Sequence, residues 1–218
     1  MTLMARSEAE LAAVAAEIGD RGGQAAVHPG DVTDPDAVAA AVSFADAAGS
    51  LSLCVNAAGV NRPGPTRDLA LEDFDAVLDT NVRGTFLVCQ AVGRRLLDAG
   101  RRGRIVNVSS QMGAVGYPGR AAYCASKHAV NGLTRALGVE WAEAGIAVNA
   151  VAPTFVLTPL TAPMLADPDF RADVLARIPA NRIGTVEEVV GAVVFLCSDQ
   201  ASLIAGHILA VDGGWTAW

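Results

Sequence analysis

Short apolar runs alternate with longer stretches of helical periodicity along this chain. Glycine, proline or small polar residues bound the apolar runs, as they commonly bound strands. Apolar strands separated by helices are typical of a parallel sheet that is covered on both faces. The expected strands are 1–5, 24–32, 51–59, 103–110, 146–153 and 207–214, and the expected helices are 6–23, 34–49, 69–100, 119–145 and 185–199. The pattern predicts an α/β fold with a doubly wound parallel sheet, in one domain over 1–218.

Composition narrows the class of protein further. The net charge is -7 and the arginines form no long basic run, so nucleic acid is not an expected partner. No apolar run reaches the ~18 to 20 residues of a membrane helix, and the start lacks the features of a secretion signal. The cysteines are widely spaced among apolar residues, which favours reduced thiols over metal ligands. We expect a cytoplasmic protein without a structural metal.

Small and polar residues recur at the carboxyl ends of the expected strands. In doubly wound sheets these ends form the ligand-binding edge. The residues concerned are Asp31, Val32, 56–59, Ser109, Ser110, 153–158 and 212–214. Their recurrence predicts that the ligand site lies along this edge.

Lys127 is the single lysine among sixteen basic residues, and it follows Tyr123 by four positions. Chance is one explanation. A physical explanation is that i and i+4 share a helix face, so the ammonium group would lie beside the phenol. A neighbouring cation lowers the pKa of a tyrosine, which can then act as a general acid or base. The spacing alone is a weak motif.

Five motifs in register carry a family resemblance: "NAAG" at 56–59, "NVRG" at 81–84, "IVNVSS" at 105–110, "YCASK" at 123–127 and "VDGG" at 211–214. With these motifs the whole chain resembles the short-chain dehydrogenase/reductase family. The resemblance implies a Rossmann-like fold and hydride transfer between a nicotinamide coenzyme and a carbonyl/alcohol pair.

The resemblance also implies a catalytic set. Tyr123 would exchange the proton, Lys127 would lower its pKa and hold the nicotinamide ribose, and Ser110 would hold the reacting oxygen. Asn81 would anchor a relay water. Taken singly, Tyr123 fits a core residue, Ser110 a helix N-cap and Asn81 a solvated helical residue. Ser109, beside Ser110, is the expected structural hydroxyl.

For the coenzyme, the resemblance implies NADP, with NAD as the alternative. Ala5 leaves the position of an NAD-selecting acid empty, and the adjacent Arg6 suits a 2′-phosphate, although it also fits an exposed helix-turn residue. Thr154 departs from the family, which usually has glycine there. The residues matching the coenzyme site are Arg6, Asp31, Val32, Asn56, Ala57, Gly59, Tyr123, Lys127, Pro153, Val156 and Thr158.

On the substrate side, residues 158–182 resemble the family's variable lid, and Gln111 and Met112 would face the substrate. Apolar lid candidates are Leu160, Met164, Leu165 and Phe170, and Tyr117 fits packing or the substrate wall. The run from Ser110 resembles members that act on sugar acids and polyols. Reduction of 3-oxoacyl thioesters is the rival expectation.

The family's first strand and glycine-rich turn have no counterpart here, because the chain opens in what resembles the second strand. We therefore expect that Met1 is not the natural start and that two inner sheet edges stay unpaired. A functional form would carry one more strand–turn–helix unit. A non-catalytic interaction subunit is the alternative. Segments 72–98 and 121–144 resemble the helices of the family's interface, which implies a homodimer or homotetramer.

Overall fold

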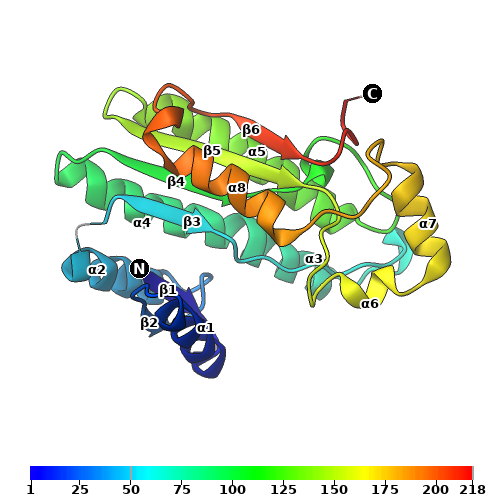
Figure 1. The fold of residues 1–218 in the computed structure, drawn as a ribbon, viewed down its shortest axis with the longest axis horizontal. Coiled ribbons are helices and arrows are strands. Elements are labelled where there is room, and N and C mark those ends of the chain that lie inside the picture. Colours follow the sequence, from blue (N-terminus) through cyan, green and yellow to red (C-terminus); the bar gives the residue numbers. More distant parts are fainter. Residues whose placement is uncertain (50, 218) are drawn as a thin grey trace.

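The strands of the computed structural model, which describes residues 1–49 and 51–217, form two parallel sheets. The first sheet pairs β1 with β2, and the second has the order β3-β4-β5-β6 (Figure 1). The strands are β1 (Thr2–Ala5), β2 (Ala26–Pro29), β3 (Leu53–Asn56), β4 (Gly103–Val108), β5 (Ile146–Pro153) and β6 (Ile208–Val211). All ladders are parallel, which confirms the predicted class of sheet.

The helices cover both faces of the four-stranded sheet. Helices α4 and α5 lie behind it and α8 in front of it, in the view of Figure 1. The α-helices are α1 (Glu8–Asp20), α2 (Pro35–Gly49), α3 (Leu71–Leu78), α4 (Thr85–Asp98), α5 (Ala121–Trp141), α6 (Ala162–Leu165), α7 (Pro168–Ala176) and α8 (Val186–Cys197). Because helices cover both faces of this sheet, its strands are apolar on both sides.

Two segments differ from the sequence prediction. The helix expected over 69–100 is α3 and α4 joined by a π-helical turn, Asp79–Gly84. The segment 158–182, for which the sequence predicted no helix, contains α6 and α7. Pro168 stands in the first turn of α7, where its missing N–H costs nothing, and Asp167 caps that turn through its side chain. Prolines here start a helix instead of interrupting one.

The central strands β4 and β5 lie between two apolar clusters. On the α4–α5 side, Leu96, Ile105 and Val148 are fully buried, and Trp141 packs against them. On the α8 side, Val106 and Leu196 occupy the equivalent positions. This two-sided burial fixes the positions of the residues that follow β4 and β5, where the candidate site lies.

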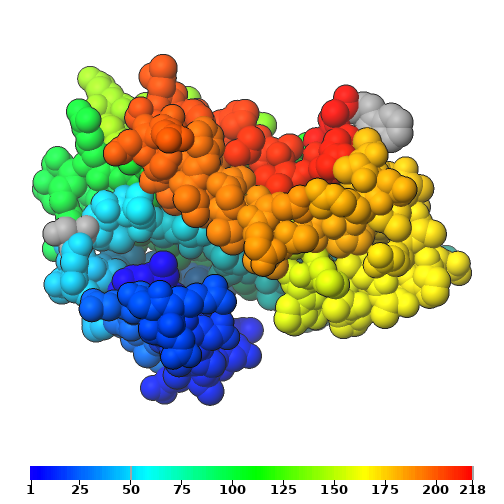
Figure 2. Space-filling view, in the orientation of Figure 1, coloured from blue at the N-terminus to red at the C-terminus, as the bar shows by residue number. Residues whose placement is uncertain are grey.

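Residues 1–49, which contain β1, α1, β2 and α2, form a separate layer of the molecule, which we call the N-terminal unit. It stands apart from the strand edge of β3 in Figures 1 and 2 and packs through α2 against α4. No ladder joins β1 to β3 within the described residues, which confirms the expectation of two unpaired inner edges. Leu53 and Val55 of β3 are 47% and 46% exposed there.

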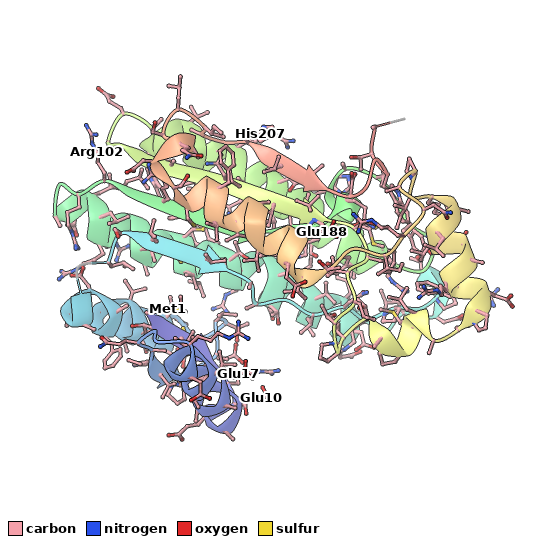
Figure 3. All side chains as sticks on the ribbon, in the orientation of Figure 1. Met1, Glu10, Glu17, Arg102, Glu188 and His207 are labelled. Atoms are coloured by element: carbon pink, nitrogen blue, oxygen red, sulfur yellow. The ribbon has the colours of Figure 1, made fainter. Side chains whose placement is uncertain are left out.

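Glu10, Glu17 and Arg102 are examples of charged side chains at the periphery of the molecule (Figure 3). Glu10 and Glu17 of α1 point outward from the N-terminal unit, and Arg102 lies at the opposite end from α6 and α7. Across residues 1–49 and 51–217, no helix is long and apolar enough to cross a membrane.

Candidate active site

Ser110, Gln111, Met112 and Tyr123 line one hollow of about 290 Å³ beyond the carboxyl end of β4. The sequence predicted these four residues as a group around the reacting centre, and the structure brings them together. Strand β4 leads into the first three residues, and α5 presents Tyr123. The remaining lining residues are Asn61, Pro63, Arg120, Thr154, Phe155, Leu160, Thr161 and Met164.

Lys127 lies one helical turn after Tyr123 on the same face of α5, as the spacing predicted. Its Nζ is 5.5 Å from the centroid of the Tyr123 ring and donates to the Val108 carbonyl oxygen at 2.8 Å. The side chain is buried, with 4% exposure. Burial lowers the pKa of Lys127 from 10.5 to about 8, because it penalises the charged form.

The pKa of Tyr123 is raised, chiefly by burial, whereas the sequence suggested a lowered pKa. Removal from water disfavours the phenolate, and here it outweighs the opposing groups. The Ser110 hydroxyl and the positive charge of Arg120 both lower this pKa. A further lowering by Lys127 stays a prediction.

Ser110 has two simultaneous contacts. Its Oγ accepts from the Met112 N–H at 3.1 Å and donates to Oε1 of Gln111 at 2.7 Å. The first contact caps the 3-10 turn Gln111–Gly113, so the N-cap reading is confirmed while the residue still lines the hollow. Ser109 instead donates to Oδ1 of Asn131 at 2.6 Å, and this confirms that it is the structural hydroxyl.

Asn81 is fully buried in the π-helical turn, so the reading as a solvated helical residue is wrong. Its Oδ1 accepts from the Val60 N–H at 2.8 Å, and its Nδ2 donates to the Val60 carbonyl at 2.9 Å and to Ser126 Oγ at 3.0 Å. These bonds hold the loop after β3 against α5. A Cβ added to Gly59 would lie 3.3 Å from Asn81 Oδ1 and 3.6 Å from Lys127 Nζ. The relay-water role of Asn81 stays a prediction.

Three of the residues predicted for the coenzyme site, Arg6, Asp31 and Val32, follow the carboxyl ends of β1 and β2. Arg6 directly follows β1 and is exposed. Asp31 Oδ1 accepts from both the N–H and the hydroxyl of Thr33, each at 2.9 Å. Hydrogen bonding from Thr33 is the main cause that lowers the pKa of Asp31, and the charge of Arg6 adds to it. Val32 packs on Gly84, where a Cβ would lie 2.7 Å from its Cγ2.

Asn56 ends β3, and Ala57 follows it at the sheet edge. The Asn56 side chain turns into the core, where Nδ2 donates to Oδ1 of Asn107 at 2.9 Å. Asn107 in turn donates to Thr134 Oγ1 at 3.0 Å. The Asn56 side chain is therefore structural, which the sequence did not predict.

The segment predicted for the nicotinamide end continues from β5. Pro153 closes that strand, Val156 is buried and bridges to Gly184, and Thr158 Oγ1 lies 3.1 Å from Thr161 Oγ1. Thr154, which stands where the family usually has glycine, donates its backbone N–H to the Val211 carbonyl at 3.2 Å. The added side chain is therefore accommodated without loss of the contact between β5 and β6.

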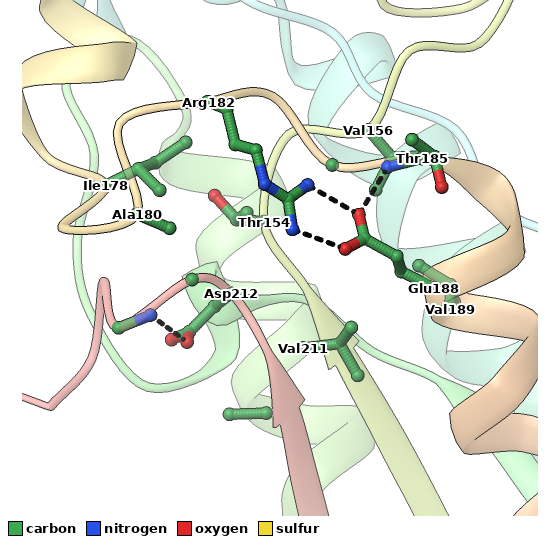
Figure 4. A pocket seen from close by; sticks show the side chains of 14 residues that line it. Thr154, Val156, Ile178, Ala180, Arg182, Thr185, Glu188, Val189, Val211 and Asp212 are labelled. Carbon is green, nitrogen blue, oxygen red and sulfur yellow. Dashed lines mark hydrogen bonds and ion pairs between the residues drawn. The ribbon is translucent and has the colours of Figure 1, made fainter.

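A larger hollow, of about 340 Å³, lies on the α8 side of the same strand ends (Figure 4). Its charged groups are already paired within the protein. Arg182 donates to Glu188 at 2.9 Å, and Asp212 accepts from the Gly214 and Thr216 N–H groups at 3.0 and 2.9 Å. The smaller hollow contains the reactive groups, so size alone does not identify the site.

Unpartnered polar atoms concentrate around the smaller hollow. Six buried side-chain nitrogen or oxygen atoms lack a hydrogen-bond partner in the described residues. Asn61 Oδ1 and Gln111 Nε2 belong to the lining of this hollow, and Thr154 Oγ1 belongs to a residue that lines both hollows. Such atoms are uncommon in proteins and call for an explanation. Asn61 and Arg120 were not predicted. Each stands a few residues from a family motif, but the contact of Arg120 with Met164 joins segments distant in sequence and leaves no local pattern.

Comparison with known proteins gives a family. A family model described as Enoyl-(Acyl carrier protein) reductase matches residues 1–216. D-threitol dehydrogenase of Mycolicibacterium smegmatis is 44% identical over 210 residues, covering 94% of this chain and 78% of the relative. Gluconate 5-dehydrogenase of Gluconobacter oxydans is 40% identical over 187 residues, covering 85% of this chain and 73% of the relative.

A solved structure gives the same result at the level of the fold. The gluconate 5-dehydrogenase of Burkholderia cenocepacia, in complex with NADP and tartrate, superposes with a TM-score of 0.94 at 33% identity. The match covers all of this chain (100%) and 85% of that chain. The fold of this chain therefore agrees with that of this gluconate 5-dehydrogenase.

Proposed function

Because this chain belongs to the short-chain dehydrogenase/reductase family, we propose that it interconverts a secondary alcohol and a ketone on a sugar acid or a polyol. One observation carries the proposal: Ser110 and Tyr123 line one hollow, with Lys127 buried beneath Tyr123. The unpartnered amide atoms of that hollow, Asn61 Oδ1 and Gln111 Nε2, support a substrate with several hydroxyl groups, because each atom needs a polar partner.

A bound nicotinamide coenzyme would supply or take up the hydride. The Tyr123 hydroxyl would give its proton to the carbonyl oxygen during reduction, and the Tyr123 phenolate would accept the proton of the alcohol during oxidation. Ser110 would hold the same oxygen by turning its hydroxyl hydrogen from Gln111 Oε1 to the substrate. Lys127 would hold the nicotinamide ribose and favour the phenolate of Tyr123.

NADP is the coenzyme that the residues fit best. Arg6 is an exposed cation at the carboxyl end of β1, without an ion-pair partner in the described residues, and its guanidinium suits a 2′-phosphate. The Lys127 ammonium group donates one N–H to the Val108 carbonyl, which leaves two donors for the ribose at the nicotinamide end of the coenzyme. The related structure of the Burkholderia cenocepacia enzyme also contains NADP.

Residues 158–182 would act as the substrate lid within a single domain of 1–218. Leu160 and Met164 of this segment line the hollow, whereas Leu165 and Phe170 pack into an aromatic cluster with Trp215. Tyr117 belongs to this cluster and not to the lining, which supports its packing role. The lid would select substrates through its three lining residues, Leu160, Thr161 and Met164.

The rival expectation, a 3-oxoacyl thioester reductase, has some support from the description of the matching family model. A long apolar acyl chain would leave the unpartnered polar atoms of the hollow without partners, so we favour the hydroxylated substrate.

Phe86 and Val139, exposed on α4 and α5, support a dimer through these helices, which light scattering would detect. A cytoplasmic location remains a prediction.

The test is turnover of sugar acids, polyols and oxoacyl thioesters by the purified chain, with NADP and with NAD. Tyr123→Phe should lower kcat by about 10²- to 10⁴-fold with an unchanged melting temperature, because it removes only the transferable proton. Arg6→Ala should raise KM for NADP more than for NAD. Retained turnover in Tyr123→Phe would contradict the catalytic proposal. Absence of both turnover and coenzyme binding by calorimetry would favour the non-catalytic alternative.

A further inference from the structure

Arg120 is a buried cation in the wall of the candidate active site. Its residue exposure is 8%, although arginine is among the side chains least often buried. The guanidinium donates to the Gly119 carbonyl at 3.1 Å and lies 3.4 Å from the sulfur of Met164. Both partners are neutral, so the charge of Arg120 is not compensated by either.

Within residues 1–49 and 51–217, no carboxylate pairs with Arg120. Of the two acidic residues in the neighbouring lid helix, Asp169 is exposed and Asp173 is already occupied. Asp173 accepts from Arg177 at 3.0 Å and from the Tyr117 hydroxyl at 2.7 Å. Burial lowers the pKa of Arg120, and the groups that act on it electrostatically are Tyr117, Tyr123 and Cys124, none of which is a carboxylic acid. A buried charge without a counter-charge is unfavourable, so a ligand anion is its natural partner.

Gln111 adds a second donor to the same hollow. Its side chain is buried, with 2% residue exposure, and its Oε1 already accepts from Ser110. The Nε2 of the same amide has no partner. On the loop after β3, Asn61 Oδ1 is an acceptor without a partner. The wall therefore offers a cation and an amide donor, and one acceptor for a hydroxyl group.

We propose that Arg120 recognises a carboxylate, and that the substrates of this pocket are hydroxy acids of the aldonate class and the corresponding keto acids. The planar guanidinium matches a carboxylate with two parallel hydrogen bonds, which a neutral polyol cannot reproduce. Gln111 Nε2 would donate to a hydroxyl or carbonyl oxygen of the same substrate. The inference rests on the proposed dehydrogenase function. Of the two substrate classes proposed above, it favours the sugar acids over the polyols. The carboxylate of the substrate takes no part in hydride transfer.

Matched pairs of ligands test this choice, because an aldonate and its alditol differ in one terminal group. D-gluconate with D-glucitol, and D-galactonate with galactitol, would be titrated calorimetrically into the full chain, with and without NADP. The acids should bind at least ~10-fold more tightly than the alditols, in keeping with a hydrogen-bonded charge pair. Arg120→Met should remove this difference by weakening the acids and leaving the alditols within about threefold.

Two further variants separate recognition from folding. Arg120→Lys keeps the charge without the planar fork and should keep part of the preference for the acid. Arg135→Met removes an exposed arginine from the same helix, outside the hollow, and should change neither ligand. In turnover assays, Arg120→Met should raise KM for the acids much more than KM for the alditols, because only the acids lose a contact with the guanidinium.

Equal binding of acid and alditol by the unaltered chain would overturn the inference, and so would a loss in Arg120→Met that is the same for both ligands. If Arg120→Met does not fold, the inference is tested by two other measurements. These are the ratio of acid to alditol affinity in the unaltered chain and the change of that ratio in Arg120→Lys. Turnover of alditols without aldonates would reject the carboxylate site and keep the dehydrogenase. Absence of turnover for every pair would reject the dehydrogenase itself, whereas selective binding of the acids would still support Arg120.

Discussion

At the scale of the residue, burial of Lys127 makes the stability of the fold depend on pH in the range where this side chain titrates. Its ammonium group has a folded-state pKa of about 8, below the ordinary 10.5. Between these values the unfolded chain binds more protons than the folded chain, so stability rises with pH. Below about pH 8 the cost of the buried charge is fully present.

We therefore predict that Lys127→Met, which has no charge to bury, loses this pH dependence. From about pH 7 to about pH 9.5, the free energy of unfolding of the unaltered chain should rise relative to the variant by roughly 2 kcal/mol. Urea unfolding of both proteins across this range measures the difference. Parallel curves would show that burial does not lower the pKa of Lys127. The variant should also lack turnover.

At the scale of the element, the close approach of α4 to α5 depends on Gly93. A Cβ built there would lie 2.4 Å from the Trp141 ring, which is buried in the core and has no free space to move into. We predict that Gly93→Ala destabilises the fold by about 1 to 3 kcal/mol, the usual cost of overpacking.

The matched control is Gly132→Ala in the middle of α5. A Cβ there meets nothing within 4 Å, and the position is exposed. Alanine should stabilise the helix by about 0.5 to 1 kcal/mol, because glycine loses more backbone entropy on folding. Thermal unfolding of both variants measures the two effects, which should have opposite signs. A Gly93→Ala variant as stable as the parent would refute the packing explanation.

At the scale of the whole molecule, the N-terminal unit depends on a few contacts with the remainder. Asp46 of α2 accepts from Arg101 at 2.6 Å and also pairs with Arg95 of α4. The Arg101 hydrogen bond is the main cause that lowers the pKa of Asp46. The stabilisation is therefore present above the ordinary pKa of an aspartate and is lost as the pH falls through the lowered value.

We predict that Asp46→Asn loosens this unit selectively. Amide hydrogen exchange in β1 and β2 should become several-fold faster near neutral pH, while exchange in β4 and β5 stays unchanged, because the two sheets share no ladder. Asp20→Asn, at the exposed end of α1, is the control and should leave both sheets unchanged. Uniform acceleration across both sheets would mean that the molecule opens as one unit.

The sequence by itself determined the order and type of most elements, because apolar periodicity is a local property of the chain. It also determined the helical spacing of Tyr123 and Lys127 and the position of Ser110 at the end of a strand. These predictions depend on regular strand and helix geometry, so they did not need the tertiary structure.

Only the tertiary structure decided which polar groups are buried and with what partner. The π-helical turn hides Asn81, the Asn56 side chain turns into the core, and desolvation raises the pKa of Tyr123. Met164 packs against Arg120, and no carboxylate of the described residues pairs with this guanidinium. Each outcome depends on residues distant in sequence, since burial and pairing are set by how the elements pack and not by any local pattern.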